Sequence, residues 1–159
     1  MILVNHQGQT RADTWHYLGI DDVPMFATNS VVRAHQWDDY HIRFGVPAPG
    51  LWLTCNQDPA EILPLLEHLT LIVIEFPKSR DGRGFTLARL LRERHGFTGD
   101  LRATGPLLPD QFAMLLQCGF SSLLVSASIP AVRWQDAAAA LHQARPRTLL
   151  ERLSQRNEA

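Results

Sequence analysis

The sequence predicts an α/β protein with repeated β–α units and a mainly parallel sheet, either an open sheet or part of a barrel. From residue 51 onward, short apolar runs alternate with helix-like segments across short connections, which is typical of parallel β–α units. A complete eightfold barrel needs about 200 residues or more, whereas this chain has 159. We therefore expect a single α/β domain over residues 1–159.

Four β–α units are visible after residue 51. Asp58 followed by Pro59 predicts an N-cap with proline in the first helical turn, and Glu61 completes the spacing of a capping box. Thr86 is the expected cap of the next helix, which Gly96 ends. The expected strands are 51–55, 71–74, 101–103 and 123–125, and the expected helices are 59–68, 87–94, 109–118 and 132–143.

The two ends of the chain are less regular. Residues 1–50 form an irregular N-terminal segment, with three prolines that interrupt any long element. Residues 144–159 are expected to form a C-terminal helix or tail, which could dock onto a second copy in a homodimer. Within the first segment we expect strands at 2–4 and 31–32, a short helical turn at 15–18 capped by Asp13 or Thr14, and a helix at 35–43.

Composition excludes several classes of protein. Hydrophobic residues make up 45% of the chain and charged residues 19%, which suits a domain with a buried core rather than a disordered chain. No apolar run approaches the roughly 20 residues that span a bilayer. The cysteines, Cys55 and Cys118, form no CxxC pair, and the seven histidines lack metal-ligand spacing. We expect a cytoplasmic protein with no metal, no cofactor and no membrane partner.

Basic residues are concentrated between positions 78 and 102. This segment has a net charge of +4, whereas the remainder of the chain has −5. Its first loop, residues 76–85, combines two glycines with three basic side chains and precedes a helix. Free N–H groups at a helix N-terminus and arginine side chains both bind anions. In parallel β–α folds such loops meet at the carboxyl edge of the sheet, where ligands bind.

The same residues have a purely structural interpretation, which the sequence leaves open. The glycines could serve the turn alone, and the arginines could form a solvated rim or pair with Asp81, Glu75 and Asp110. Arg102 lies within a strand, so it should pair with a carboxylate or reach the ligand edge. The candidate ligand-binding residues are Lys78, Arg80, Asp81, Gly82, Arg83, Gly84, Arg89, Arg102, Asp110 and Gln111. No residue is assigned a catalytic role.

A series of motifs resembles the bacterial family named domain of unknown function nine-three-four. The resemblance is clear over residues 76–120 and looser at Asp13-x-Trp15 and residues 44–55. The motifs are Phe76–Pro77–Lys78, Asp81–Gly82–Arg83–Gly84–Phe85, residues 87–94, Gly96–Phe97, Gly99–Asp100–Leu101–Arg102–Ala103, Asp110–Gln111 and Cys118–Gly119–Phe120.

This chain departs from the family pattern at four positions. Ser79 replaces an expected bulky aromatic residue, Pro106 an aspartate, and Pro109 and Gln117 arginines. The departures put in doubt any activity that depends on residues 104–109, but they leave the loop from Asp81 to Arg83 intact.

The resemblance implies a role in sulfur metabolism, because the family is commonly encoded beside sulfite reductase and labelled an oxidoreductase of sulfite reduction. We expect an accessory protein of assimilatory sulfite reduction that binds a small anion or a nucleotide-like ligand at the arginine-rich loop. The alternative is a non-catalytic partner that docks on sulfite reductase or a related enzyme. The chain has no flavin, nicotinamide, haem or iron–sulfur motif, so whether it is an enzyme stays open. Nucleic-acid binding is disfavoured by a pI of about 6.6.

Overall fold

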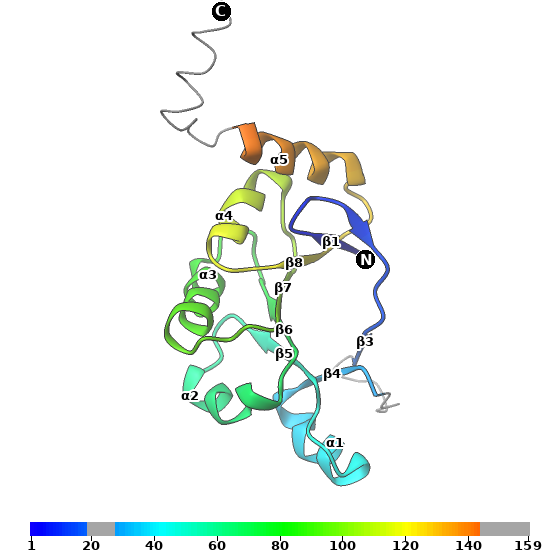
Figure 1. The fold of residues 1–159 in the computed structure, drawn as a ribbon, viewed down its shortest axis with the longest axis vertical. Coiled ribbons are helices and arrows are strands. Elements are labelled where there is room, and N and C mark those ends of the chain that lie inside the picture. Colours follow the sequence, from blue (N-terminus) through cyan, green and yellow to red (C-terminus); the bar gives the residue numbers. More distant parts are fainter. Residues whose placement is uncertain (19–27, 144–159) are drawn as a thin grey trace, which may run out of the picture.

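The computed structural model describes residues 1–18 and 28–143, which form one curled sheet with helices (Figure 1). Its strands are β1 (Ile2–Asn5), β2 (Thr10–Arg11), β3 (His16–Tyr17), β4 (Ser30–Arg33), β5 (Gly50–Thr54), β6 (Leu71–Glu75), β7 (Asp100–Thr104) and β8 (Ser122–Val125). Its α-helices are α1 (Trp37–Phe44), α2 (Pro59–Ile62), α3 (Gly82–Arg89), α4 (Phe112–Gln117) and α5 (Ala131–Gln143). Four short helical segments, η1 (Ala34–Gln36), η2 (Leu63–His68), η3 (Leu90–Arg94) and η4 (Pro109–Gln111), adjoin the helices.

The strands run in the order β2-β1-β8-β7-β6-β5-β4-β3. All neighbours from β8 to β3 are parallel, whereas β1 is antiparallel to both β8 and β2. The predicted α/β class with a mainly parallel open sheet is therefore confirmed. The irregular N-terminal segment supplies strands at both edges of this sheet, and residues 144–159 lie outside the described residues.

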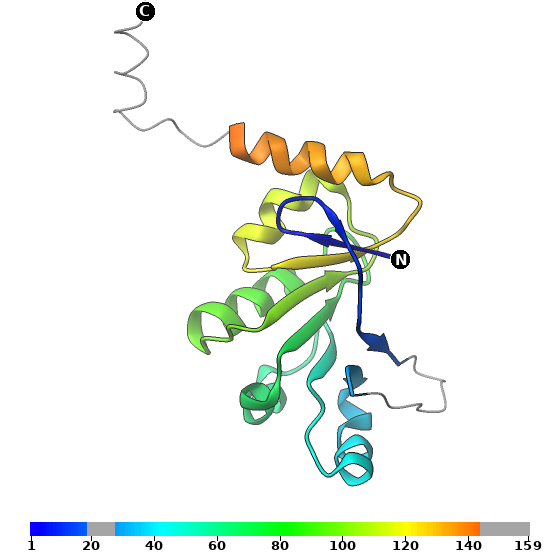
Figure 2. The same ribbon diagram turned by 45° about the vertical axis from the view of Figure 1, so that its right-hand side comes forward.

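The sheet must curl because β2 and β3 are consecutive in the chain but lie at opposite edges. A flat sheet of this order would separate them by roughly 34 Å, at about 4.8 Å per strand. The connection, residues 12–15, spans roughly 17 Å at most. We call residues 12–17 the strap. It crosses the face of the sheet opposite α2, α3 and α4, which Figures 1 and 2 show on the other side.

The helix-covered face holds the main core. Leucine, isoleucine and valine side chains from the inward positions of β5 to β8 pack there against buried residues of α2, α3 and α4. The other face, called the open face, holds a smaller apolar cluster of Val31, Leu71 and Val73 beneath Trp15, Tyr17 and Trp52. Successive strand residues point to opposite faces, so Leu101 and Ala103 enter the main core, whereas Asp100, Arg102 and Thr104 face the strap.

Two local expectations were wrong. Residues 15–18 form no helical turn; instead His16 and Tyr17 pair with β4 as strand β3. Helix α3 begins at Gly82 rather than after Thr86. Asp81 is its N-cap, because the Asp81 carboxylate accepts a hydrogen bond from the Arg83 N–H at 3.1 Å. Tertiary packing of the helix outweighs the low helix propensity of its two glycines.

Arg92 in η3 fastens the amino ends of β7 and β8 to that helix. Its guanidinium donates hydrogen bonds to the backbone carbonyls of Phe97, Gly99 and Gly119, at 2.5, 2.8 and 2.9 Å. The guanidinium also lies 5.4 Å from the centre of the Phe97 ring. One side chain therefore satisfies three carbonyls that belong to two separate loops.

Replacing Arg92 with methionine should lower the free energy of unfolding by about 2 kcal/mol, because partly buried carbonyls lose their donors. Urea denaturation measures the loss. Arg94→Met is the matched control, since Arg94 is exposed in the same segment and its loss should stay within about 0.5 kcal/mol. Equal effects of the two substitutions would contradict the assigned role of Arg92.

Candidate functional site

The arginine-rich loop borders a cavity of about 510 Å³. The cavity lies between the starts of α2 and α3, beyond the carboxyl ends of β5 and β6, where ligands bind in parallel β–α folds. We call it the α2–α3 cavity. Its lining residues are Cys55, Gln57, Pro59, Gly82, Arg83, Thr86, Leu87 and Leu90.

Arg83 is the cationic side chain of this cavity. Its Nε donates to Asp81 Oδ1 at 2.9 Å and its Nη2 donates to Asp81 Oδ2 at 2.6 Å. The Arg83 guanidinium holds the pKa of Asp81 well below its usual range. Nη1 makes no hydrogen bond to any residue that the structure describes, and 60% of the Arg83 side chain is exposed. Arg83 can therefore bind an additional anion without losing Asp81.

Cys55 closes the inner wall of the cavity and is buried. Burial raises the pKa of its thiol, and the neighbouring Asp81 carboxylate raises that pKa further. The thiol is therefore protonated at neutral pH, and a protonated thiol is a poor nucleophile. Cys55, Gln57 and Thr86 were not among the predicted residues. The placement of α2 beside α3 brings Cys55 and Gln57 to the arginine-rich loop, and Thr86 was interpreted only as a helix cap.

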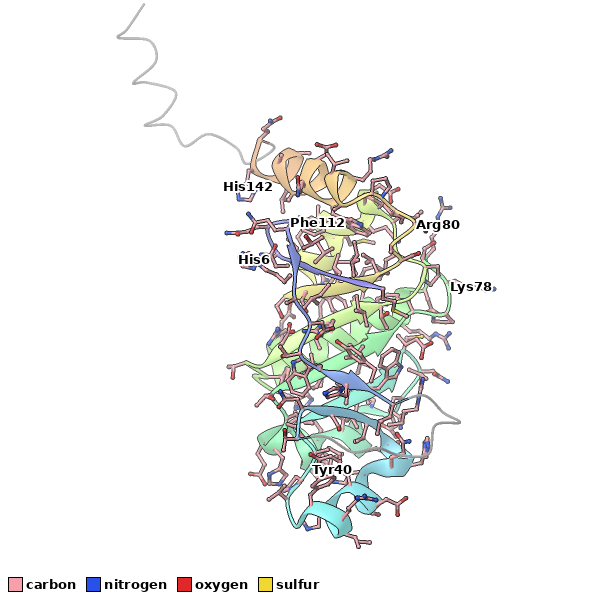
Figure 3. The ribbon with its side chains drawn as sticks, turned by 90° about the vertical axis from the view of Figure 1, so that its right-hand side faces the viewer. His6, Tyr40, Lys78, Arg80, Phe112 and His142 are labelled. Carbon is pink, nitrogen blue, oxygen red and sulfur yellow. The ribbon has the colours of Figure 1, made fainter. Side chains whose placement is uncertain are left out.

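The other residues of the predicted site lie outside the α2–α3 cavity or have a structural role. Lys78 and Arg80 are exposed and project away from the ribbon (Figure 3); neither pairs with an acidic residue in the described part of the chain. Gly84 is needed for packing, because a Cβ atom there would lie 2.5 Å from the Phe76 ring. Arg89 and Asp110 are exposed outside the cavity lining.

Gln111 joins two neighbouring loops at the carboxyl edge. Its side-chain N–H donates to the carbonyl of Ser79, and its side-chain oxygen accepts a hydrogen bond from Leu108 N–H at 3.1 Å. Both polar ends of the amide are thus engaged. Gln111 shapes the arginine-rich loop from outside rather than lining the α2–α3 cavity.

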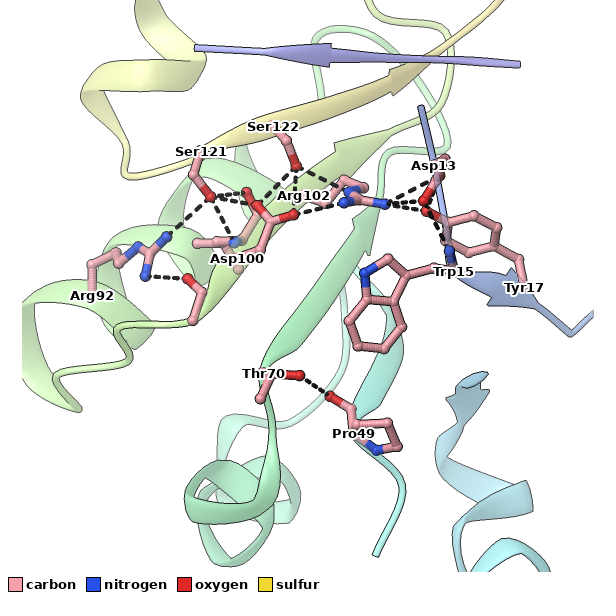
Figure 4. Close-up of polar contacts among 12 residues, drawn as sticks. Asp13, Trp15, Tyr17, Pro49, Thr70, Arg92, Asp100, Arg102, Ser121 and Ser122 are labelled. Carbon is pink, nitrogen blue, oxygen red and sulfur yellow. Dashed lines mark hydrogen bonds and ion pairs between the residues drawn. The ribbon is translucent and has the colours of Figure 1, made fainter. Parts of the chain in front are cut away.

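Arg102 lies apart from the loop, on the open face. All three guanidinium nitrogens are engaged: Nη2 donates to Asp100 at 2.7 Å, Nε to Ser122 at 3.0 Å, and Nη1 to both carboxylate oxygens of Asp13 at 3.2 Å and to the Tyr17 hydroxyl (Figure 4). The sequence-based expectation that it pairs with a carboxylate is met. Because the α2–α3 cavity is on the helix side of the sheet, Arg83 and Arg102 do not converge on one site.

The Arg102 network holds the strap to the sheet. Tyr17 donates to Asp13 at 2.6 Å, and burial together with this hydrogen bond raises the pKa of the Tyr17 phenol. Ser121 and Ser122 donate to Asp100 at 2.5 and 2.8 Å. The sequence pointed to one member of this network, because Asp13 belongs to the motif Asp13-x-Trp15 in the family resemblance. It did not indicate that Asp13 pairs with Arg102.

A larger cavity, of about 700 Å³, lies at the opposite end of the strands between η2 and residues 95–98. None of the predicted residues lines it. The α2–α3 cavity, in contrast, is lined by Gly82 and Arg83 of the arginine-rich loop.

Comparison with known families extends the resemblance. The model of a bacterial protein of unknown function, DUF934, matches residues 50–152. The chain belongs to the DUF934 family. The match covers β5 to α5 and includes the arginine-rich loop and the α2–α3 cavity. It also includes the residues of β7 and β8 that take part in the Arg102 network. No curated protein and no solved structure matches this DUF934 chain.

Two further properties of the described residues bear on the class of DUF934 protein. None of the helices in residues 1–18 and 28–143 has the length and apolar character needed to cross a membrane. Within the same ranges, no three histidine, cysteine or acidic side chains gather as metal ligands would.

Proposed function

We propose that this DUF934 protein is an accessory protein of sulfite reduction that binds a small anion, or the anionic part of a nucleotide-like ligand, in the α2–α3 cavity. The observation that carries the binding proposal is Arg83, which lines the cavity and keeps one guanidinium nitrogen free of hydrogen bonds to the described residues. The cavity volume of about 510 Å³ is within the usual range for small-molecule sites. The link to sulfite reduction rests on the family resemblance.

Binding should appear as an increase in melting temperature when the protein is mixed with millimolar sulfite, sulfate, phosphate or adenosine monophosphate. A ligand that binds the folded state stabilises it in proportion to the logarithm of its concentration above Kd. Calorimetric titration then gives the affinity of the anion that stabilises most. We expect a Kd of roughly 1 mM or below for the anion that binds best. If none of the four anions raises the melting temperature at millimolar concentrations, the binding proposal fails.

Two substitutions with opposite expected effects locate the site. Arg83→Met should weaken binding of the best anion about tenfold, because a charge-assisted hydrogen bond is lost. Asp81→Asn keeps a capping oxygen but removes the competing carboxylate, so binding should tighten by up to about fivefold. Arg94→Met makes the same charge change as Arg83→Met away from the cavity and should leave affinity unaltered. Equal weakening of anion binding by Arg83→Met and Arg94→Met would indicate non-specific electrostatics.

Lys78 and Arg80 favour a second function, docking on an acidic face of sulfite reductase or a related enzyme. Both are exposed at the carboxyl edge and unpaired within the described residues, and charged rims of this kind accelerate association. Biosensor measurement with purified sulfite reductase separates the two functions. Docking predicts that Lys78→Ala/Arg80→Ala weakens the complex while anion binding in the α2–α3 cavity persists.

A further inference from the structure

The open face carries a second cleft, separate from the α2–α3 cavity and from the residues predicted for it. Two adjoining cavities, of about 400 Å³ and 320 Å³, share Met1, Trp52 and Leu124 in their walls. The larger one lies at the carboxyl ends of β6, β7 and β8, and the smaller one continues beneath the strap. We call the two together the open-face cleft.

One end of the open-face cleft is polar and offers hydrogen-bond acceptors. Glu75 ends β6 there, and both of its contacts are made through Oε2: the Trp52 indole N–H donates at 2.8 Å, and Arg33 lies at 3.6 Å. Oε1 has no partner among the described residues. Thr104 donates its hydroxyl proton to the Leu124 carbonyl at 2.9 Å, which leaves its oxygen able to accept. A ligand group that meets Glu75 Oε1 and the Thr104 oxygen must therefore donate hydrogen bonds.

The other end is aromatic and apolar. Trp15, Tyr17 and Trp52 line it together with Leu3 and Leu124. Tyr17 and Trp52 meet edge to face, with ring centres 5.8 Å apart and ring planes at 78°. Because the Arg102 network holds Asp13 and Tyr17, this aromatic wall is preorganised before a ligand arrives.

Charge selects further between ligands. Among the described residues, the charged side chains in the lining are the carboxylates of Glu75 and Asp13, and Met1 lines both cavities with the α-amino end of the chain. Arg33 is bound to Glu75 and lies over the Trp52 ring, 5.1 Å from its centre, and Arg102 is bound to Asp13 and Asp100. The open-face cleft therefore presents carboxylate oxygens to a ligand, whereas the α2–α3 cavity presents the Arg83 guanidinium.

We propose that the open-face cleft binds a small arylalkylamine, an aliphatic amine that carries an aromatic ring, as its cation. The protonated amine pairs with Glu75 Oε1 and donates to the neighbouring oxygen of Thr104, while the aromatic ring packs against Trp52 beneath the strap. Aromatic rings and a carboxylate are the groups that proteins combine to recognise organic cations. This site is independent of anion binding in the α2–α3 cavity.

Three probes of one shape test the charge requirement: 2-phenylethylamine, 2-phenylethanol and 3-phenylpropionate. The readout is the indole N–H resonance of Trp52 in ¹⁵N-labelled protein, together with calorimetric affinity. The amine should shift that resonance and bind about tenfold more tightly than the alcohol, as expected for one charge-assisted hydrogen bond, and the carboxylate should bind least. No shift of Trp52 by the amine at millimolar concentration, or an equal affinity for amine and alcohol, would overturn the proposal.

Glu75→Gln keeps an acceptor for the Trp52 N–H but removes the charge, so the preference for the amine over the alcohol should disappear. Ser128→Tyr is a second variant that leaves Glu75 in place: Ser128 is an exposed residue of the polar wall, and a tyrosine there should block all three probes. Arg83→Met should leave amine binding unaltered, so a failure here is distinguishable from a failure of anion binding. Retained amine preference in Glu75→Gln would refute the assignment to Glu75.

Discussion

Replacing Arg102 with methionine should lower the free energy of unfolding by about 3 kcal/mol. Removing one partner of a buried ion pair typically costs about 3–5 kcal/mol, because the remaining charge is left uncompensated. The Arg102 side chain is only 4% exposed, while Asp13 and Asp100 are 19% and 31% exposed. We therefore expect the lower end of that range. Equilibrium unfolding in urea measures the change.

A second measurement shows where the Arg102 substitution acts. Arg102 is the residue that joins the strap to β7 and β8, so amide hydrogen exchange in residues 12–17 should accelerate more than exchange in β6. Arg80→Met, on the exposed loop, should change stability by no more than about 0.5 kcal/mol. A loss below about 1 kcal/mol for Arg102→Met, or uniform acceleration across the sheet, would contradict the role of Arg102 as the anchor of the strap.

Replacing Gly105 with alanine should destabilise the protein by about 3–5 kcal/mol, through backbone strain and overpacking together. Gly105 has φ +121°, and a Cβ atom at this position would lie 2.2 Å from the Phe76 carbonyl oxygen. The backbone on both sides is held by pairing, since Phe76 N–H donates to the Thr104 carbonyl at 2.8 Å. Because Phe76 begins the arginine-rich loop, the substitution should also weaken the proposed binding of an anion in the α2–α3 cavity.

Gly45 provides a control that separates strain from steric overlap. It also has a positive φ, +69°, but no atom lies within 4 Å of the position that a Cβ would occupy. Gly45→Ala should therefore cost only the conformational strain, about 1–2 kcal/mol. Thermal and urea unfolding of the two variants measure the difference. Equal losses would mean that Phe76 can move aside and that the close approach at Gly105 has no structural role.

Local patterns in the sequence were sufficient to predict the strands and helices of the β–α core. The apolar run from Leu71 to Ile74 predicted a strand, and β6 is the strand Leu71–Glu75 with four fully buried residues. Asp58 caps α2 as predicted, accepting from Ala60 N–H at 2.9 Å. Such features depend on neighbouring residues only, so periodicity and capping rules apply to them directly.

The candidate site was predicted only in part. The loop around Arg83 was found because its charge and glycines are consecutive in the chain, and it does border a cavity. The position of Arg102 on the other face follows from strand alternation, but the sequence-based grouping joined it to the loop by proximity in sequence. Glu75 was considered as an ion-pair partner, and it pairs with Arg33 rather than with a residue of the arginine-rich loop.

Local chemistry in this chain was enough to establish repeated strands and helices and a basic loop at the carboxyl edge. The partnership of Arg102 with Asp13 joins residues 89 positions apart, and no local pattern encodes it. It arises because a short connection draws the two edges of an eight-stranded sheet toward each other and carries the strap across the open face. The curvature of the sheet, a property of all its strands together, thus separates the α2–α3 cavity, which Arg83 lines on one face, from the open-face cleft with its carboxylates and aromatic rings on the other.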